Sequence, residues 1–357
     1  MSVCASVILT SMSANATPKL QDKKNNINAG MTAQMEQEYK PKILTPNADI
    51  VDKISTPKAQ EAVRKLLALL TLRKLDIPSQ DNSQSFEGDG HGGETSNRIY
   101  GGQVVAQALQ AAYQTVHGQL CHSLHAYFLR PGKLDMPVRY DVLPLRDGKS
   151  FTTRRITAIQ SDHIIFDMLA SFHRDEEGFD HQHHRPDFLP DPELLPPRDE
   201  LRRAKLRDLN LEPPQEDTRL CPIDIREIEP QNPFAPQPRS DRNALWFRLV
   251  DKVSVDQPMQ QCLLAYASDM HLLSSGARPH GLSWSQSPIM GASLDHAMWF
   301  HHPIDFSDWH VYAMEAPFTG KARSYNRGLI HDQHGRLVAS VTQEGLMRPL
   351  DERLRKS

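Results

Sequence analysis

An aspartate at the end of an apolar run is the clearest candidate for chemistry in this sequence. Asp269 follows the segment LLAYAS at 263–268, which reads as part of an apolar helix. A carboxylate in such a place is costly unless it is paired or functional, so Asp269 is a candidate general acid or base. The simpler interpretation is that Asp269 ends the helix and faces solvent, and the pattern leaves both open.

Two further polar side chains stand in segments with the pattern of strands. Gln343 follows Ala339 and Val341 at a spacing of two, so it shares their face of a strand. Ser293 opens the apolar run SLDHAMWF at 293–300. A surface amide and an ordinary strand-start hydroxyl are the simpler interpretations of these two positions.

Two histidine positions could suggest a general base. Asp295 and His296 are adjacent, but neighbours on a strand point to opposite faces, so they do not form an acid–base pair. His122 opens the strand-like run HSLHAYFLRP, where a half-buried histidine with a satisfied hydrogen bond is the commoner case. We therefore do not expect either histidine to be catalytic.

Motifs of several other chemistries are absent from the sequence or out of context. The serine-nucleophile, zinc-hydrolase and P-loop patterns do not occur. A formal G-x-G-x-x-G at Gly88, Gly90 and Gly93 follows polar coil and not a strand, which disfavours a dinucleotide site. The run HQHH at 181–184 has no cysteine or carboxylate at metal-ligand spacing, so we interpret it as a solvated loop. The residues predict neither a metal nor a cofactor.

The elements that must position these residues form two similar sets. Turn signals and β-branched or aromatic runs predict a meander of strands after a helix, which is an α+β unit. Pro131 precedes Gly148 by the same number of residues by which Pro303 precedes Gly320, so the unit is repeated. The predicted helices are 59–75, 100–116 and 260–273, and the predicted strands are 122–131, 138–148, 150–160, 163–173, 222–229, 244–250, 292–303, 309–320, 321–331 and 336–346.

The amino-acid composition distinguishes the folded units from segments that lie outside a hydrophobic core. The hydrophobic share of 39% is low and the 26 prolines are many, so part of the 357 residues is linker or tail. We expect a disordered polar leader at 1–56, a first unit at 57–174, a proline-rich charged linker at 175–220 with a short helix near 198–208, and a second unit at 221–351.

The net charge, the length of the apolar runs and the spacing of the cysteines limit the possible binding partners and the cellular compartment. A net charge of −3 argues against a protein that coats nucleic acid, and no apolar run is long enough to span a membrane. The four cysteines, Cys4, Cys121, Cys221 and Cys262, are far apart, as in a reducing compartment. The last residues, 355–357, read RKS and are a poor peroxisomal address.

Seven blocks of the sequence stand out within about residues 59–349. They are GGQVVAQAL (101–109), HSLHAYFLRPG (122–132), YDVLPLRDGKSF (140–151), GFDHQ (178–182), YASD (266–269), LDHAMWFH (294–301) and ASVTQEGLMR (339–348). These blocks resemble the acyl-CoA thioesterase II family. The resemblance implies a double hotdog, that is, two long helices each wrapped by an antiparallel sheet. It also implies hydrolysis of fatty acyl-CoA to free fatty acid and CoA, a homo-oligomer, and a peroxisomal or cytoplasmic location.

The resemblance also implies a catalytic trio, whose positions hold Asp269, Ser293 and Gln343 in this chain. Many bacterial members have threonine where this chain has Ser293, which keeps the hydroxyl. The matching positions of the first unit hold Cys121 and approximately Arg174, so we expect one active centre per chain, in the second unit.

The expected mechanism is direct attack of a positioned water on the thioester carbonyl. Asp269 would take the water proton, Ser293 and Gln343 would hold the water, and helix N–H groups near 101–102 would polarise the carbonyl. Basic residues should meet the CoA phosphates, with Lys321, Arg323, Arg327, Arg154 and Arg155 as candidates and exposed solvated side chains as the alternative. A non-catalytic acyl-CoA-binding protein and a hotdog dehydratase are the competing functions.

Overall fold

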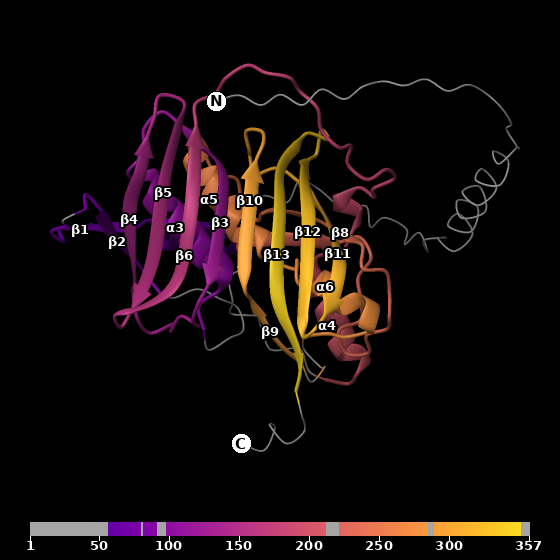
Figure 1. Cartoon of the computed structure of the whole chain (residues 1–357). Helices are drawn as coiled ribbons and strands as arrows, with labels where there is room; N and C mark the ends of the chain where they lie inside the picture. Colours follow the sequence, from indigo (N-terminus) through magenta and orange to yellow (C-terminus); the bar gives the residue numbers. More distant parts are fainter. Residues whose placement is uncertain are drawn as a thin grey trace, which may run out of the picture. The chain divides into compact units, whose positions relative to one another are not determined.

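One antiparallel sheet runs through the described part of the protein. The computed structural model describes residues 56–350, apart from 80, 91–97, 212–220, 285, 286 and 288. Within these residues 13 strands form one sheet in the order β1-β2-β4-β5-β6-β3-β10-β13-β12-β11-β8-β7, and β9 pairs with β13 (Figure 1). The strands of the first half are β1 (Arg73–Leu75), β2 (Gln84–Gly88), β3 (Leu120–Phe128), β4 (Val138–Asp147), β5 (Phe151–Gln160) and β6 (His163–His173). Those of the second half are β7 (Ile223–Glu227), β8 (Asn243–Leu249), β9 (Ile289–Ser293), β10 (Asp295–Phe300), β11 (His310–Gly320), β12 (Arg323–Asp332) and β13 (Leu337–Pro349).

The two halves of the sheet join edge to edge at β3 and β10. Their antiparallel register places Tyr127 opposite Asp295 and Ser123 opposite Trp299. One long helix backs each half, α3 (Gly101–Tyr113) in the first and α5 (Gln257–Ser268) in the second, and the two helices pack against each other behind the sheet (Figure 1). A long helix against an antiparallel sheet, present twice, confirms the α+β double hotdog.

The helices begin where local chemistry favours a start. In α2 (Pro57–Leu70), Thr56 Oγ1 accepts a hydrogen bond from Ala59 N, and proline occupies the first turn. In α5, Asp256 Oδ1 accepts from Met259 N at 3.0 Å. Helix α3 has no side-chain cap, and small and β-branched residues fill it, so it fits closely between the sheet and α5.

The first predicted helix and the coil after it differ from the structure. The helix predicted over 59–75 ends at Leu70, and β1 follows it, paired with β2. Strand β2 occupies the stretch up to Gly88 that the sequence predicts as polar coil, so the expectation that no strand precedes the G-x-G-x-x-G is wrong, and Phe86 of this strand is fully buried. Both strands exist because β2 pairs with β4, a contact between distant segments that local pattern does not reveal.

Two elements of the second half are also shorter than predicted. The helix predicted over 260–273 ends at Ser268, and a separate short helix, α6 (Ser274–Ala277), follows. The strand predicted over 292–303 is broken at Leu294, whose N–H donates to Glu344 O and whose carbonyl accepts from Phe128 N, both at 2.9 Å. The short helix expected near 198–208 is confirmed as α4 (Arg198–Asp208).

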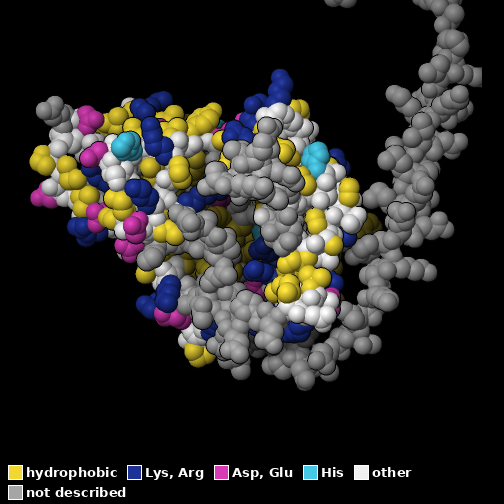
Figure 2. All heavy atoms as spheres, turned by 90° about the horizontal axis from the view of Figure 1, so that it is seen from below, with side chains coloured by type: hydrophobic (Ala, Val, Ile, Leu, Met, Phe, Trp, Pro, Cys, Tyr) yellow, Lys and Arg dark blue, Asp and Glu magenta, His cyan; other side chains and the backbone are white. Residues whose placement is uncertain are grey.

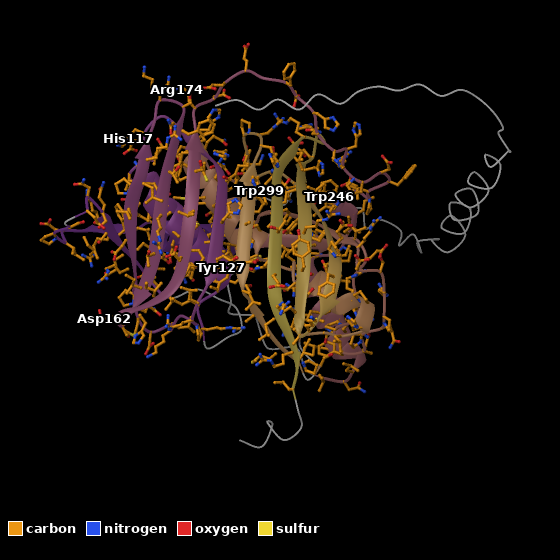
Figure 3. The ribbon with its side chains drawn as sticks, in the orientation of Figure 1. His117, Tyr127, Asp162, Arg174, Trp246 and Trp299 are labelled. Atoms are coloured by element: carbon orange, nitrogen blue, oxygen red, sulfur yellow. The ribbon has the colours of Figure 1, made fainter. Side chains whose placement is uncertain are left out.

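The segment between the two halves covers part of the sheet face that is turned away from α3 and α5. Trp246 Nε1 donates to Pro190 O at 3.0 Å, and Trp309 Nε1 donates to Glu193 Oε1 at 2.9 Å. The same face over β3 and β10 carries Tyr127, which is 63% exposed (Figure 3 labels it, with Trp246 and Trp299).

The expectations on membrane helices, cysteines, metal sites and the leader involve some residues that the structure does not describe. In the described part of the chain no helix is both long and apolar enough to cross a membrane. Among the described cysteines, Cys121 and Cys262 are free thiols. Within the described residues no three His, Cys, Asp or Glu side chains are grouped as a metal site. Residues 1–55 of the predicted leader, with Cys4, and the last residues 351–357 lie outside the described part.

Candidate active site

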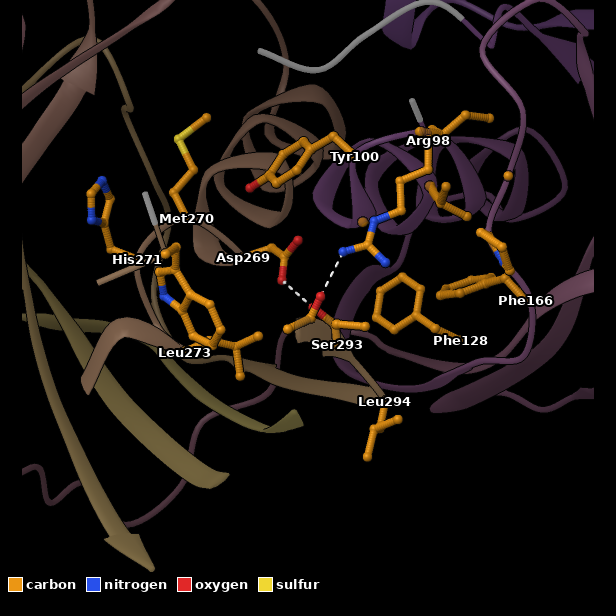
Figure 4. Close-up of a pocket in the computed structure, with 18 of the residues that line it drawn as sticks. Arg98, Tyr100, Phe128, Phe166, Asp269, Met270, His271, Leu273, Ser293 and Leu294 are labelled. Atoms are coloured by element: carbon orange, nitrogen blue, oxygen red, sulfur yellow. Dashed lines mark hydrogen bonds between the residues drawn. The ribbon is translucent and has the colours of Figure 1, made fainter. Parts of the chain in front are cut away.

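Asp269 lies at the end of α5, where it caps the helix and is half-buried. Tyr312 OH donates to the carbonyl of the preceding residue, Ser268, at 3.0 Å and so holds this helix end against the sheet. Asp269 Oδ1 accepts hydrogen bonds from Ser293 Oγ at 3.2 Å and from Gln343 Nε2 at 2.5 Å (Figure 4 shows the first). The three residues predicted as a trio therefore meet at one carboxylate.

The second carboxylate oxygen is held by the first half of the chain. Gly102 N donates to Asp269 Oδ2 at 2.9 Å, and this N–H belongs to the first turn of α3. A Cβ at Gly102 would stand 2.3 Å from Tyr266 O, and one at Gly101 would stand 2.7 Å from Asp269 Oδ2. Only glycines allow this close approach, which brings the positive end of a helix dipole to the carboxylate.

This contact changes the role expected for the start of α3. The sequence suggested that N–H groups near 101–102 polarise a substrate carbonyl. In the structure the Gly102 N–H is already bonded to Asp269, so this donor orients the carboxylate.

Gln343 approaches Asp269 from inside the protein. It lies on β13 and is fully buried, so the surface interpretation of this residue is wrong. Its Nε2 donates to Asp269, whereas its Oε1 has no partner among the described residues. Buried polar atoms are nearly always hydrogen-bonded, so a bare acceptor next to a carboxylate marks a place for a donor such as water.

A cavity of about 700 Å³ opens beside the carboxylate, and Asp269 and Ser293 are part of its wall. Gln343 is not among the residues that line it. Apolar side chains such as Phe128, Phe166 and Leu273 form much of the wall (Figure 4). Figure 2 shows the end of the molecule at which β3 ends, where the surface is hollowed between hydrophobic and basic side chains.

The basic residues of this wall are not those that the sequence suggested. Arg98, Arg130 and Arg198 line the cavity and are exposed. Arg98 Nη2 donates to Gly291 O at 2.7 Å, and Arg130 Nη1 donates to Ile164 O at 2.6 Å. Their positions beside Tyr100-Gly101 and before Pro131 gave no charge pattern from which a shared wall could be predicted.

The five basic residues proposed for the CoA phosphates lie outside the described cavity wall. Arg154 is buried and donates to Thr115 Oγ1 at 2.9 Å, so it is structural. Arg155, Arg323 and Arg327 pair with carboxylates on neighbouring strands, namely Asp167, Glu344 and Glu315, and Lys321 lies in the turn before β12.

The two histidine positions have structural partners. His122 Nε2 lies 2.8 Å from Ser171 Oγ, and burial lowers the pKa of this imidazole. It stands six residues before Phe128 on β3, about 20 Å along the strand from the cavity. His296 is fully buried, with Nε2 2.9 Å from Ser268 Oγ, and burial lowers its pKa as well. His296 thus helps to hold the end of α5, which sequence reasoning missed.

Among the described residues, the first half carries no equivalent of the Asp269 cluster. Helix α3 ends at Tyr113 and its C-cap is Gln114, an amide where α5 has its aspartate. Cys121, the counterpart of Ser293, is buried and points its Sγ at Ser123 O at 3.3 Å. The N-terminus of α5 has a proline in its first turn and is capped by Asp256, so it presents no free positive end.

Comparison with known proteins assigns the family. The model "Acyl-CoA thioesterase N-terminal domain" matches residues 91–173, and the model "Acyl-CoA thioesterase" matches residues 216–346. Acyl-CoA thioesterase 2 of Haemophilus influenzae is 34% identical over 297 residues, which is 81% of this chain and 98% of that protein. A yeast relative, peroxisomal acyl-coenzyme A thioester hydrolase 1 of Saccharomyces cerevisiae, is 24% identical over 70% of this chain and 86% of its own length. The crystal structure of the acyl-CoA thioesterase II TesB2 from Mycobacterium marinum is 34% identical, covers 79% of this chain and 97% of that one, and superposes with a TM-score of 0.63.

A helix-backed antiparallel sheet present twice, with a hydrogen-bonded carboxylate on a cavity wall, defines a double-hotdog enzyme. The chain belongs to the acyl-CoA thioesterase II family and is a thioester hydrolase. The resemblance seen in the sequence is confirmed.

Proposed function

We propose that this enzyme hydrolyses fatty acyl-CoA to free fatty acid and CoA, with Asp269 as the general base. The observation that carries the proposal is the Asp269 carboxylate on the cavity wall, held by Ser293 Oγ, Gln343 Nε2 and Gly102 N. Water beside Asp269 gives up a proton to the carboxylate while its oxygen bonds to the thioester carbonyl carbon. The C–S bond then breaks, and the CoA thiolate takes the proton.

The three donors fix the carboxylate before substrate arrives. A base that is already oriented avoids much of the entropy cost of attack. Ser293 lies on the cavity wall, so its hydroxyl can also contact the water. Gln343 does not line the cavity and holds Asp269 through the hydrogen bond from its Nε2. Its Oε1, on the same amide group, has no hydrogen-bond partner among the described residues. General-base catalysis by Asp269 is worth about 10²–10⁴ in rate.

The test is thiol release from palmitoyl-CoA, measured with a thiol dye. We expect Asp269→Asn to lose activity by about 10²–10⁴. Asp167→Asn is the matched control because Asp167 is also a half-buried carboxylate but pairs with Arg155 on the opposite face of the sheet. Near wild-type activity in a folded Asp269→Asn protein would rule out the proposed base.

We further propose that the enzyme is a homo-oligomer whose copies meet through the uncovered sheet face. Tyr127 and Leu169 are 63% and 46% exposed there, and the segment between the halves covers the same face elsewhere. Light scattering should give a multiple of the chain mass, and Tyr127→Lys with Leu169→Lys should reduce it. A wild-type monomer would contradict the proposal.

We also propose the remaining boundaries and a peroxisomal or cytoplasmic location. The unit 57–174 encloses the first family match, 91–173, and the unit 221–351 encloses the second, 216–346, except for its first five residues. The segment 175–220 connects the two units. The name of the yeast relative supports the peroxisome, and the free thiols of Cys121 and Cys262 suit either compartment. Microscopy of a fluorescent fusion that leaves the C-terminus exposed distinguishes the two locations.

A further inference from the structure

Two paired phenylalanines stand on the cavity wall. Phe128 of β3 and Phe166 of β6 are paired in the sheet register, and their ring centroids lie 5.2 Å apart. Both line the cavity, and Phe166 is only 1% exposed. Figure 4 shows the two rings on one side of Asp269, with Met270 and His271 on the other.

This aromatic pair begins directly beside the Asp269 cluster. A Cβ at Gly101 would stand 2.7 Å from Asp269 Oδ2 and 3.1 Å from Phe128 Cζ, so a single methyl group would touch both. A thioester placed at Asp269 therefore has the Phe128 ring as its neighbour on that side.

The buried part of the cavity wall is apolar, whereas the exposed rim is charged. Ile99, Val104 and Ile165 line the cavity and are 7%, 4% and 5% exposed. Arg98 and Arg130 line the same cavity but are exposed. An alkyl chain gains free energy from apolar burial, and a phosphate loses it, so the acyl end belongs inside and the nucleotide end at the rim.

Beyond the pair, the cavity does not continue along the same face of the sheet. The next inward-facing pair of β3 and β6 is Ala126 with Met168, and neither residue lines the cavity. Along these two strands the cavity therefore reaches Phe128 and Phe166 and no further.

We propose that Phe128 and Phe166 are the end wall of the acyl-chain pocket and set the longest acyl group that the enzyme hydrolyses efficiently. The inference rests on the proposed function, because it assigns the acyl end of the same substrate. It predicts that the longest acyl group hydrolysed efficiently becomes longer when either ring is replaced by a smaller side chain and shorter when Phe128 is replaced by a larger one.

The experiment compares kcat/KM for a series of saturated acyl-CoAs from butanoyl to palmitoyl. Each methylene that becomes buried should raise kcat/KM about fourfold until the chain meets the wall, after which the rise stops. In Phe166→Leu or Phe128→Leu, one or two further methylenes fit, so the first substrates beyond the wild-type limit gain about four- to sixteenfold. Phe128→Trp should shorten the limit.

Phe172→Leu is the matched control. Phe172 lies on β6 with the same inward orientation as Phe166, is fully buried and packs edge-on against Tyr113 at 5.1 Å, but it does not line the cavity. The substitution removes the same atoms and should leave the chain-length profile unchanged.

The outcomes separate this inference from the proposed function. Opposite shifts in Phe128→Leu and Phe128→Trp, with no shift in Phe172→Leu, support the end wall, and the half-buried Phe128 provides this test even where Phe166→Leu does not fold. Unchanged profiles in active Phe128 variants, or an equal shift in Phe172→Leu, overturn it. A wild-type enzyme that releases no thiol from any acyl-CoA would overturn the proposed function instead.

Discussion

Replacing Gln343 by methionine removes one hydrogen bond from the Asp269 carboxylate and little else. Methionine keeps the length of the side chain, so the fully buried site stays filled. A hydrogen bond to a charged group contributes about 1.5–3 kcal/mol, which corresponds to roughly 10- to 150-fold in rate. Because Gln343 does not line the cavity, we expect this loss in kcat with little change in KM.

Stability distinguishes this effect from a general disturbance of the fold. Gln343 Oε1 is buried without a partner among the described residues, so Gln343→Met also removes an unsatisfied acceptor. We therefore expect the melting temperature to stay close to wild type while kcat falls. Gln160→Met is the control, since Gln160 is buried, bonds to the backbone of Lys133 and Met136, and neither lines the cavity nor contacts Asp269.

The assay is steady-state thiol release from palmitoyl-CoA for both variants, with thermal melts of the same preparations. Gln160→Met should melt at a lower temperature but keep its kcat. A folded Gln343→Met enzyme with wild-type kcat would refute the claim that Gln343 orients the base.

Three further predictions concern the cavity and the buried histidines. Ser293→Ala removes the 3.2 Å bond to Asp269, so kcat should fall by roughly 10- to 150-fold, and Ser293→Thr should restore it; failure of threonine to rescue would contradict a hydroxyl role. Arg130→Gln should raise KM for acyl-CoA but not for an acyl-N-acetylcysteamine thioester, which carries no phosphate; equal effects on both substrates would exclude phosphate binding at this rim. Burial lowers the pKa of His296 and His310 from 6.5, so the unfolded chain binds protons there that the folded protein does not. The free energy of unfolding is therefore highest above about pH 6.5 and decreases as the pH falls below it. His310→Phe should reduce the fall in melting temperature between about pH 7 and pH 5. An unchanged fall would show that His310 is not responsible.

Local pattern was sufficient for the repeat, but for the site it gave only a shared face. The alternation of Ala339, Val341 and Gln343 places all three on one face of β13, yet a surface amide was the simpler interpretation, and the structure buries all three. Matching turn signals in the two halves likewise reflect the two helix-backed sheets. Such features depend on periodicity and turn chemistry, which a sequence displays directly.

The parts that the sequence did not predict depend on contacts between distant segments. The break at Leu294 exists because β3 and β13 both bond to this residue. The role of Gly102 depends on Tyr266 O, which lies on another helix and excludes a Cβ. The cavity arginines likewise share a wall only after folding, whereas three of the basic residues chosen from the sequence, Arg155, Arg323 and Arg327, pair with carboxylates on adjacent strands.

The central claim is that Asp269 activates the water that cleaves the thioester. The most direct measurement is the single-turnover rate of palmitoyl-CoA hydrolysis by Asp269→Asn in excess over substrate, alongside the dissociation constant of the same variant for palmitoyl-CoA. The account predicts a rate lower by about 10²–10⁴ with substrate still bound. A single-turnover rate within a few-fold of wild type would contradict it.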